Sequence, residues 1–129
     1  MNHNEINCWS DASYSQHKSV SIVAYKINFD SIKTIKFDNI KNTQAEIFGI
    51  EFCINLIIKN YPQVQIINIY TDCQYAFKQN YSIYKNQLNV QIQINLIKVK
   101  GHQKMKNMNW SDLIFKKVDK FARKTLRNL

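Results

Sequence analysis

The chain has only nine acidic residues against 18 lysines and arginines among 129 residues, so the positions of the acids are informative. Asp11 lies in the apolar run around WSDASY, Asp72 closes the Ile-rich run IINIYTD, Glu46 lies near the start of an amphipathic segment, and Asp119 lies in KKVDKFARK. Carboxylates that converge repel one another unless a hard divalent cation such as Mg²⁺ or Mn²⁺ neutralises them. A site of this kind that holds two ions suits the hydrolysis of phosphodiesters. These acids therefore predict a metal-dependent site for phosphate chemistry.

Each of these acids also has a purely structural interpretation. Glu46 lies three residues after Thr43, which is the spacing of a helix capping box. Asp119 could pair with the arginine four residues later on the same helix. Asp72 could be a turn residue or the N-cap of a helix. Asp11 is the hardest to explain structurally, because a charge inside a strand is costly to bury. Spacing alone leaves both interpretations open.

The elements that must position these acids follow from the apolar pattern. Strand-like runs come first, then a helical stripe with Pro62 just after its end, and then a short Ile-rich run typical of a central strand. The expected elements are strands over 6–14, 19–28 and 32–37, a helix over 43–60, a strand over 64–71, a short helix over 73–85, a strand over 90–100 and a helix over 110–128. No linker or repeat interrupts them, so we predict a single α/β domain over residues 1–129.

Five segments in this order resemble the successive motifs of type 1 ribonuclease H: WSDASY, NTQAEIFGIEF, IYTDCQYAF, IKVKGH and VDKFARK. The resemblance covers nearly the whole chain. It implies a ribonuclease H-like fold, a five-stranded mixed sheet of three antiparallel and then parallel strands flanked by helices. It also implies the following site residues: Asp11, Glu46, Asp72 and Asp119 as metal-binding carboxylates, and His102 in the loop before the last helix.

The activity implied by the resemblance is hydrolysis of the RNA strand of an RNA–DNA hybrid by a two-metal-ion mechanism. The ions would be Mg²⁺ or Mn²⁺, and the products would carry 5′-phosphate and 3′-hydroxyl ends. His102 would assist proton transfer or product release, which suits an imidazole with a pKa near neutrality. Without the motif, a lone histidine in a polar loop would be interpreted as a solvated side chain.

Substrate contacts are predicted from the positions of residues within the motifs. Asn42 and Gln74 are candidates to contact the 2′-hydroxyl that distinguishes RNA from DNA. Thr43 and Lys78 are candidates to bind a phosphate of the DNA strand. All four could equally be ordinary caps or solvated side chains.

The chain departs from the family pattern at three places. The loop after Asp11 (SYSQHKS) has no glycine, whereas many relatives have a Gly-rich turn there. Only 29 residues separate Asp72 from His102, too few for the long basic handle of some relatives, so this is a compact variant. The segment before Asp119 contains a second acid, Asp112, about 10.5 Å away along the helix axis. We assign Asp119 to the site because VDKFARK matches the motif and WSDLIFKK does not.

The formal charge of +9 favours a polyanionic partner such as nucleic acid. Residues 96–129 hold ten lysines and arginines against two acids, a net +8, so the basic character is concentrated near the proposed site. Lys104 and Lys106, beside His102, are therefore predicted to bind substrate. The alternative is a basic surface with no specific partner, in a sequence whose many Ile, Asn and Lys codons suggest an A/T-rich genome.

The remaining composition bears on location. No run approaches the roughly 18 apolar residues of a membrane span, and the first residues lack an apolar signal-peptide core. Three scattered cysteines indicate reduced thiols. We expect an intracellular protein, cytoplasmic or in the nucleoid or nucleus, not secreted, without a membrane partner and monomeric.

Two other classes of function stay open. One is a non-catalytic nucleic-acid-binding module, which would gain nothing from repelling carboxylates beside phosphates. The other is a different nuclease on the same fold, such as a junction resolvase or a proofreading exonuclease. An exonuclease would be favoured by a D-x-E first motif, but Asp11 is followed by Ala12 and Ser13.

Overall fold

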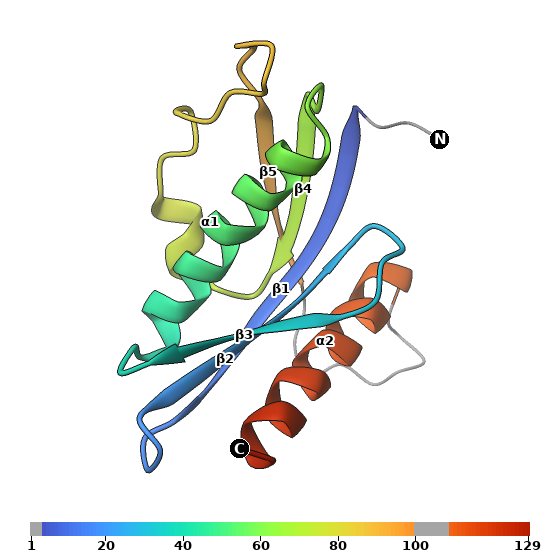
Figure 1. Cartoon of the computed structure of the whole chain (residues 1–129). Helices are drawn as coiled ribbons and strands as arrows, with labels where there is room; N and C mark the ends of the chain where they lie inside the picture. Colours follow the sequence, from blue (N-terminus) through green and yellow to red (C-terminus); the bar gives the residue numbers. More distant parts are fainter. Residues whose placement is uncertain (1–3, 100–108) are drawn as a thin grey trace.

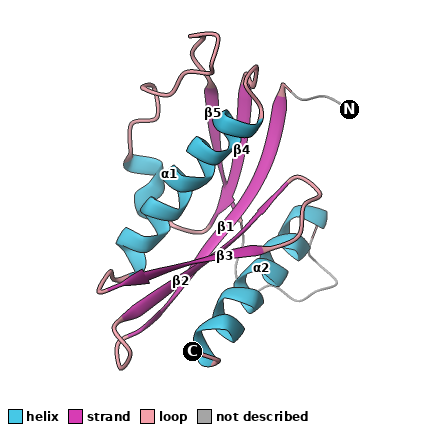
Figure 2. Ribbon diagram, viewed as in Figure 1, coloured by secondary structure: helices cyan, strands magenta, loops and turns pink. Residues whose placement is uncertain are grey.

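The computed structural model describes residues 4–99 and 109–129. In chain order its elements are β1 (Glu5–Ser15), β2 (Val20–Ile27), β3 (Lys33–Asp38), α1 (Asn42–Asn60), β4 (Ile66–Thr71), the 3₁₀ helix η1 (Gln74–Lys78), β5 (Gln93–Lys98) and α2 (Trp110–Arg127) (Figures 1 and 2). The predicted α/β class is confirmed, as is the five-stranded mixed sheet with three antiparallel and then parallel strands.

The sheet has the order β3-β2-β1-β4-β5, with β1 at its centre. Strands β1, β2 and β3 are antiparallel neighbours, and β4 and β5 join them in parallel. Strand β1 is longer than β4, which pairs only with Glu5 to Trp9 of β1, whereas β2 pairs with β1 as far as Ser15. From Ser10 onward, the edge of β1 on the β4 side therefore has no strand beside it in the described sheet.

The two α-helices cover opposite faces of the sheet, α1 on one face and α2 on the other (Figure 1). Alternate residues of β1 point to opposite faces. Ile6 and Cys8 therefore pack in the core under α1, and Trp9 packs under α2.

Helix α1 lies very close to the sheet. Its isoleucines Ile50, Ile54 and Ile57 are fully buried, as the helical stripe predicted. A Cβ at Gly49 would come within 2.6 Å of Val23 Cγ1 on β2. Gly49 is therefore needed because α1 approaches β2 too closely for a side chain at this position.

Helix α2 begins at a genuine side-chain cap. Asn109 Oδ1 accepts a hydrogen bond of 2.8 Å from the backbone N–H of Asp112, and this satisfies a donor that the first helical turn leaves free. The apolar face of α2 is buried through Ile114, Phe115, Val118, Ala122 and Leu126. The helix thus presents one apolar face to the sheet and a charged face to solvent.

The prediction of a helix over 73–85 is wrong beyond its start, because only η1 is helical in this segment. The rest is held by side-chain to backbone hydrogen bonds. Asn80 Oδ1 accepts from Ser82 N, and Asn86 Oδ1 accepts from Leu88 N and Val90 N. Asparagines in such positions compete with the helical pattern and favour turns.

Neither helix in the described ranges has the length and the apolar character needed to cross a membrane.

Candidate metal centre

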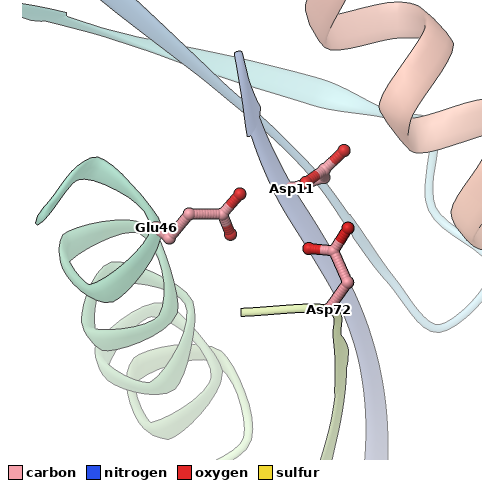
Figure 3. Close-up of side chains that lie close together, drawn as sticks. All are labelled: Asp11, Glu46 and Asp72. Carbon is pink, nitrogen blue, oxygen red and sulfur yellow. The ribbon is translucent and has the colours of Figure 1, made fainter. Parts of the chain in front are cut away.

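Three carboxylates meet where β4 ends. Asp11 comes from β1, Glu46 from α1, and Asp72 from the residue just after β4. Each offers one oxygen that lies within 4.8 Å of the oxygens offered by the other two, so a single cation could contact all three (Figure 3). Asp11 and Glu46 are buried and Asp72 is exposed, so the group is open to solvent on the Asp72 side.

The early end of β4 explains how side chains from both faces of the sheet can meet. Asp11 alternates with Trp9 and so belongs to the α2 face, whereas Glu46 comes from α1 on the other face. A neighbouring strand would separate the two faces, but none of the described strands lies beside β1 on its β4 side at this point. Asp72, which follows β4, completes the group at the same end.

Glu46 is fixed by the backbone of β1. Its Oε1 accepts a hydrogen bond of 2.8 Å from the backbone N–H of Ala12, on the strand edge that β4 leaves uncovered. The capping-box prediction for Thr43 and Glu46 is therefore wrong. The N-cap of α1 is Lys41, which has no side-chain acceptor for a cap bond, so Thr43 lies inside the first turn and Glu46 bonds to the sheet instead.

The second oxygen of Glu46 fits a bound cation. Glu46 Oε2 is buried and has no hydrogen-bond partner among the described residues. A buried oxygen of this kind is costly unless something pairs with it. Glu46, Asp11 and Asp72 together offer only oxygen donors, which suit Mg²⁺ or Mn²⁺ rather than a soft metal.

The electrostatics of the group also favour a cation. Burial, and then the charge of Glu46, raises the pKa of Asp11 well above its usual range. Burial raises the pKa of Glu46 to about 7, although hydrogen bonds from Asp11 and from the Ala12 N–H oppose this shift. Both shifts show that, without a cation, the group resists carrying its full negative charge.

Asp119 lies at the α2 side of this group. A hydrogen bond between Asp119 and Asp11 contributes to the raised pKa of Asp11, and the charge of Asp119 contributes to that of Glu46. Asp119 Oδ2 pairs with Arg123 Nη2 at 2.9 Å, so the ion pair along the helix is confirmed. Asp119 is not among the three described acids that could contact one cation, and its role as a metal ligand stays a prediction. Asp112 is not among the groups that shift either pKa, and its N–H is held at the start of α2.

The predicted substrate-binding residues lie on the α1 side. Asn42 and Thr43 are exposed in the first turn of α1, and Gln74 and Lys78 are exposed on η1, which follows Asp72. The Nζ of Lys78 lies 5.2 Å from the centre of the Tyr75 ring. The other predicted residues lie outside the described residues: His102, Lys104 and Lys106.

A functional candidate that the sequence analysis did not single out is a row of cations on α2. Lys116, Lys120, Arg123 and Arg127 line one groove beside β1. Their spacing of four, three and four residues was the available signal, because it places them on one face of a helix. The net charge of the last 34 residues had located the basic region but not this row.

No model of a protein family matches the chain, and no curated protein sequence matches it significantly.

Proposed function

We propose that this protein is a metal-dependent nuclease with a ribonuclease H-like fold, and that it hydrolyses the RNA strand of RNA–DNA hybrids. The observation that carries the proposal is the convergence of Asp11, Glu46 and Asp72, with Asp119 beside them, at the open end of a mixed sheet. The order of the motifs along the chain supports the choice of substrate.

The carboxylates are the residues that would hold two Mg²⁺ ions. When bound, the ions supply Lewis-acid activation of the attacking water and neutralise charge at the phosphate. Glu46 is held in place before any ligand arrives, since the Ala12 N–H fixes Oε1 and leaves Oε2 as the remaining acceptor. A preorganised acceptor loses little freedom on binding.

The remaining acids orient the site toward its substrate. Asp11 is buried at the centre, and Asp72 is exposed on the side from which a phosphate would arrive. Arg123 pairs with Asp119 and reduces the negative charge that an approaching phosphate would meet. Asn42 and Gln74 are exposed at the starts of α1 and η1, and they would hydrogen-bond a ribose 2′-hydroxyl.

The test is cleavage of a labelled RNA–DNA hybrid in Mg²⁺ and in Mn²⁺, compared with duplex DNA, duplex RNA and a four-way junction. We expect cleavage of the RNA strand of the hybrid alone, with 5′-phosphate ends on the products. Binding of the hybrid without metal-dependent cleavage would support a non-catalytic module instead. Cleavage of the junction in preference to the hybrid would indicate a resolvase.

A further inference from the structure

A groove of about 590 Å³ runs between β1 and α2. Its lining consists of four cations, one hydroxyl and one apolar residue: Ser13, Lys116, Lys120, Arg123, Leu126 and Arg127. None of these six residues is acidic, so the groove can hold an anion without a repelling group in its lining.

The cations form a straight row. Lys116, Lys120, Arg123 and Arg127 follow one another at intervals of four, three and four residues, which keeps them on one side of α2. With a rise of 1.5 Å per residue, the row extends over about 16 Å. A row of this length suits an extended chain of regularly spaced negative charges better than a single small anion.

Each wall of the groove has a residue that lies near the carboxylate group. On α2, Arg123 lines the groove and pairs with Asp119, whose carboxylate contributes to the raised pKa of Asp11. On β1, Ser13 lies two residues beyond Asp11 and therefore on the same face of the strand. A strand of nucleic acid with one phosphate at the carboxylates would therefore place its next phosphates in the groove.

The two walls are tied together at the far end. Lys18, in the turn between β1 and β2, donates from Nζ to the backbone oxygen of Leu126 at 2.9 Å and to that of Leu129 at 3.3 Å. This lysine satisfies carbonyls at the C-terminus of α2, where a positive charge is favourable. It holds the hairpin against the helix and so fixes the shape of the groove.

We propose that this groove binds the backbone phosphates of the strand that is cleaved, on one side of the scissile linkage. The inference rests on the proposed nuclease function and adds the path of one strand to it. The candidates for the other strand, Thr43 and Lys78, lie on α1 and η1, on the opposite side of the carboxylates. The RNA strand of a hybrid would thus lie on the α2 side of the carboxylates, and the DNA strand on the α1 side.

The experiment compares two double variants of α2 that lose the same charge. Lys116→Gln with Lys120→Gln removes two cations from the groove. Lys117→Gln with Lys124→Gln removes two exposed cations that do not line it. Arg123 is left intact because it also pairs with Asp119. All four lysines are exposed, so neither variant disturbs the core.

Binding of a fluorescent RNA–DNA hybrid is measured in EDTA, to prevent cleavage, across a range of salt concentrations. Each lost phosphate contact should reduce the slope of log affinity against log salt by about 0.9. We expect the groove variant to lose a slope of about 1.8, and the control variant to lose less than about 0.5. Equal losses in the two variants would overturn the proposal.

The strand is assigned with a hybrid whose DNA carries uncharged methylphosphonate linkages. If the groove holds the RNA strand, the salt slope of the groove variant falls below that of the wild type by the same amount on this hybrid as on the unmodified one. If the two proteins have the same salt slope on the modified hybrid, the groove binds the DNA strand and the assignment is wrong. Cleavage in Mg²⁺ is measured separately from binding. If the wild type does not cleave the hybrid but the groove variant still loses salt dependence, the proposed nuclease activity is wrong and the proposed binding groove is still supported.

Discussion

The two faces of the sheet carry helices of opposite character. Helix α1 has two acidic residues and one lysine, and its Glu46 is buried. Helix α2 has six basic and two acidic residues, and its Asp119 is paired with Arg123 near the surface, with 35% of the aspartate side chain exposed. Helix α1 thus contributes a buried carboxylate, and helix α2 contributes a partly exposed one that is paired with an arginine.

This difference assigns separate tasks to the two sides. The α1 side fixes geometry, because the Ala12 N–H and the close contact at Gly49 hold Glu46 relative to β1. On the α2 side, four cations line an open groove, which in our proposal attracts and guides a polyanion. Asp11 belongs to both, since it interacts with Glu46 and with Asp119.

The largest effect is expected at the residue that the two sides share. Asp11→Asn removes the central ligand, and we expect hybrid cleavage to fall by about 10²–10³-fold or more. Burial already favours the neutral form of Asp11, as its raised pKa shows, so the neutral asparagine should fold normally. Thermal unfolding in EDTA is the control. Retained cleavage in a folded Asp11→Asn variant would contradict the proposed site.

The next effect separates the two acids of α2. Asp119→Asn should reduce cleavage by about 10²-fold, because Asp119 is close enough to Asp11 to contribute to its raised pKa. Asp112→Asn should keep cleavage within about threefold, since its position in the first turn of α2 takes no part in the carboxylate group. Steady-state rates in Mg²⁺ measure both. The reverse result would assign Asp112 to the site in place of Asp119, about two helical turns earlier on α2.

Much of this arrangement could be predicted from the sequence, because it depends on local periodicity. The stripe of α1 and the Ile-rich strand β4 are visible as apolar spacing, and all three sheet strands before α1 agree with their predicted ranges to within about two residues. Asp11 was identifiable as unusual because a carboxylate inside a strand needs a partner.

The remainder depends on relations between distant segments. Glu46 can accept a hydrogen bond from the Ala12 N–H because the pairing of β4 with β1 stops at Trp9. No local spacing in the sequence indicates where that pairing stops. The segment after η1 depends on both kinds of relation, because Asn86 accepts locally from Leu88 N and also donates from Nδ2 to the distant Val64 O. The groove exists only because α2 lies along β1.

A smaller effect is expected on stability at the α1 side. Gly49→Ala would improve helix propensity by about 1 kcal/mol, but its Cβ would lie 2.6 Å from Val23 Cγ1. We expect a net loss of about 1–3 kcal/mol in the free energy of unfolding in urea. Adding Val23→Ala should recover part of that loss by making room. If the changes in the free energy of unfolding of the two single variants add up to that of the double variant, α1 packs less closely on β2 than the contact indicates.

The smallest effect is a pH-dependent stabilisation by Mg²⁺. The folded pKa of Glu46 is raised to about 7, so its contribution to metal-free stability is complete below the unfolded value near pH 4.5 and is lost as the pH rises through about 7. Mg²⁺ binds the deprotonated group and replaces the lost stability. The rise in unfolding temperature on adding MgCl₂ should therefore be a few degrees larger at about pH 8 than at about pH 5.5. NaCl at matched ionic strength is the control, and the increment should vanish in Asp11→Asn. If the rise in unfolding temperature on adding MgCl₂ does not depend on pH, Mg²⁺ binds elsewhere, and Asp11 and Glu46 do not form one metal site.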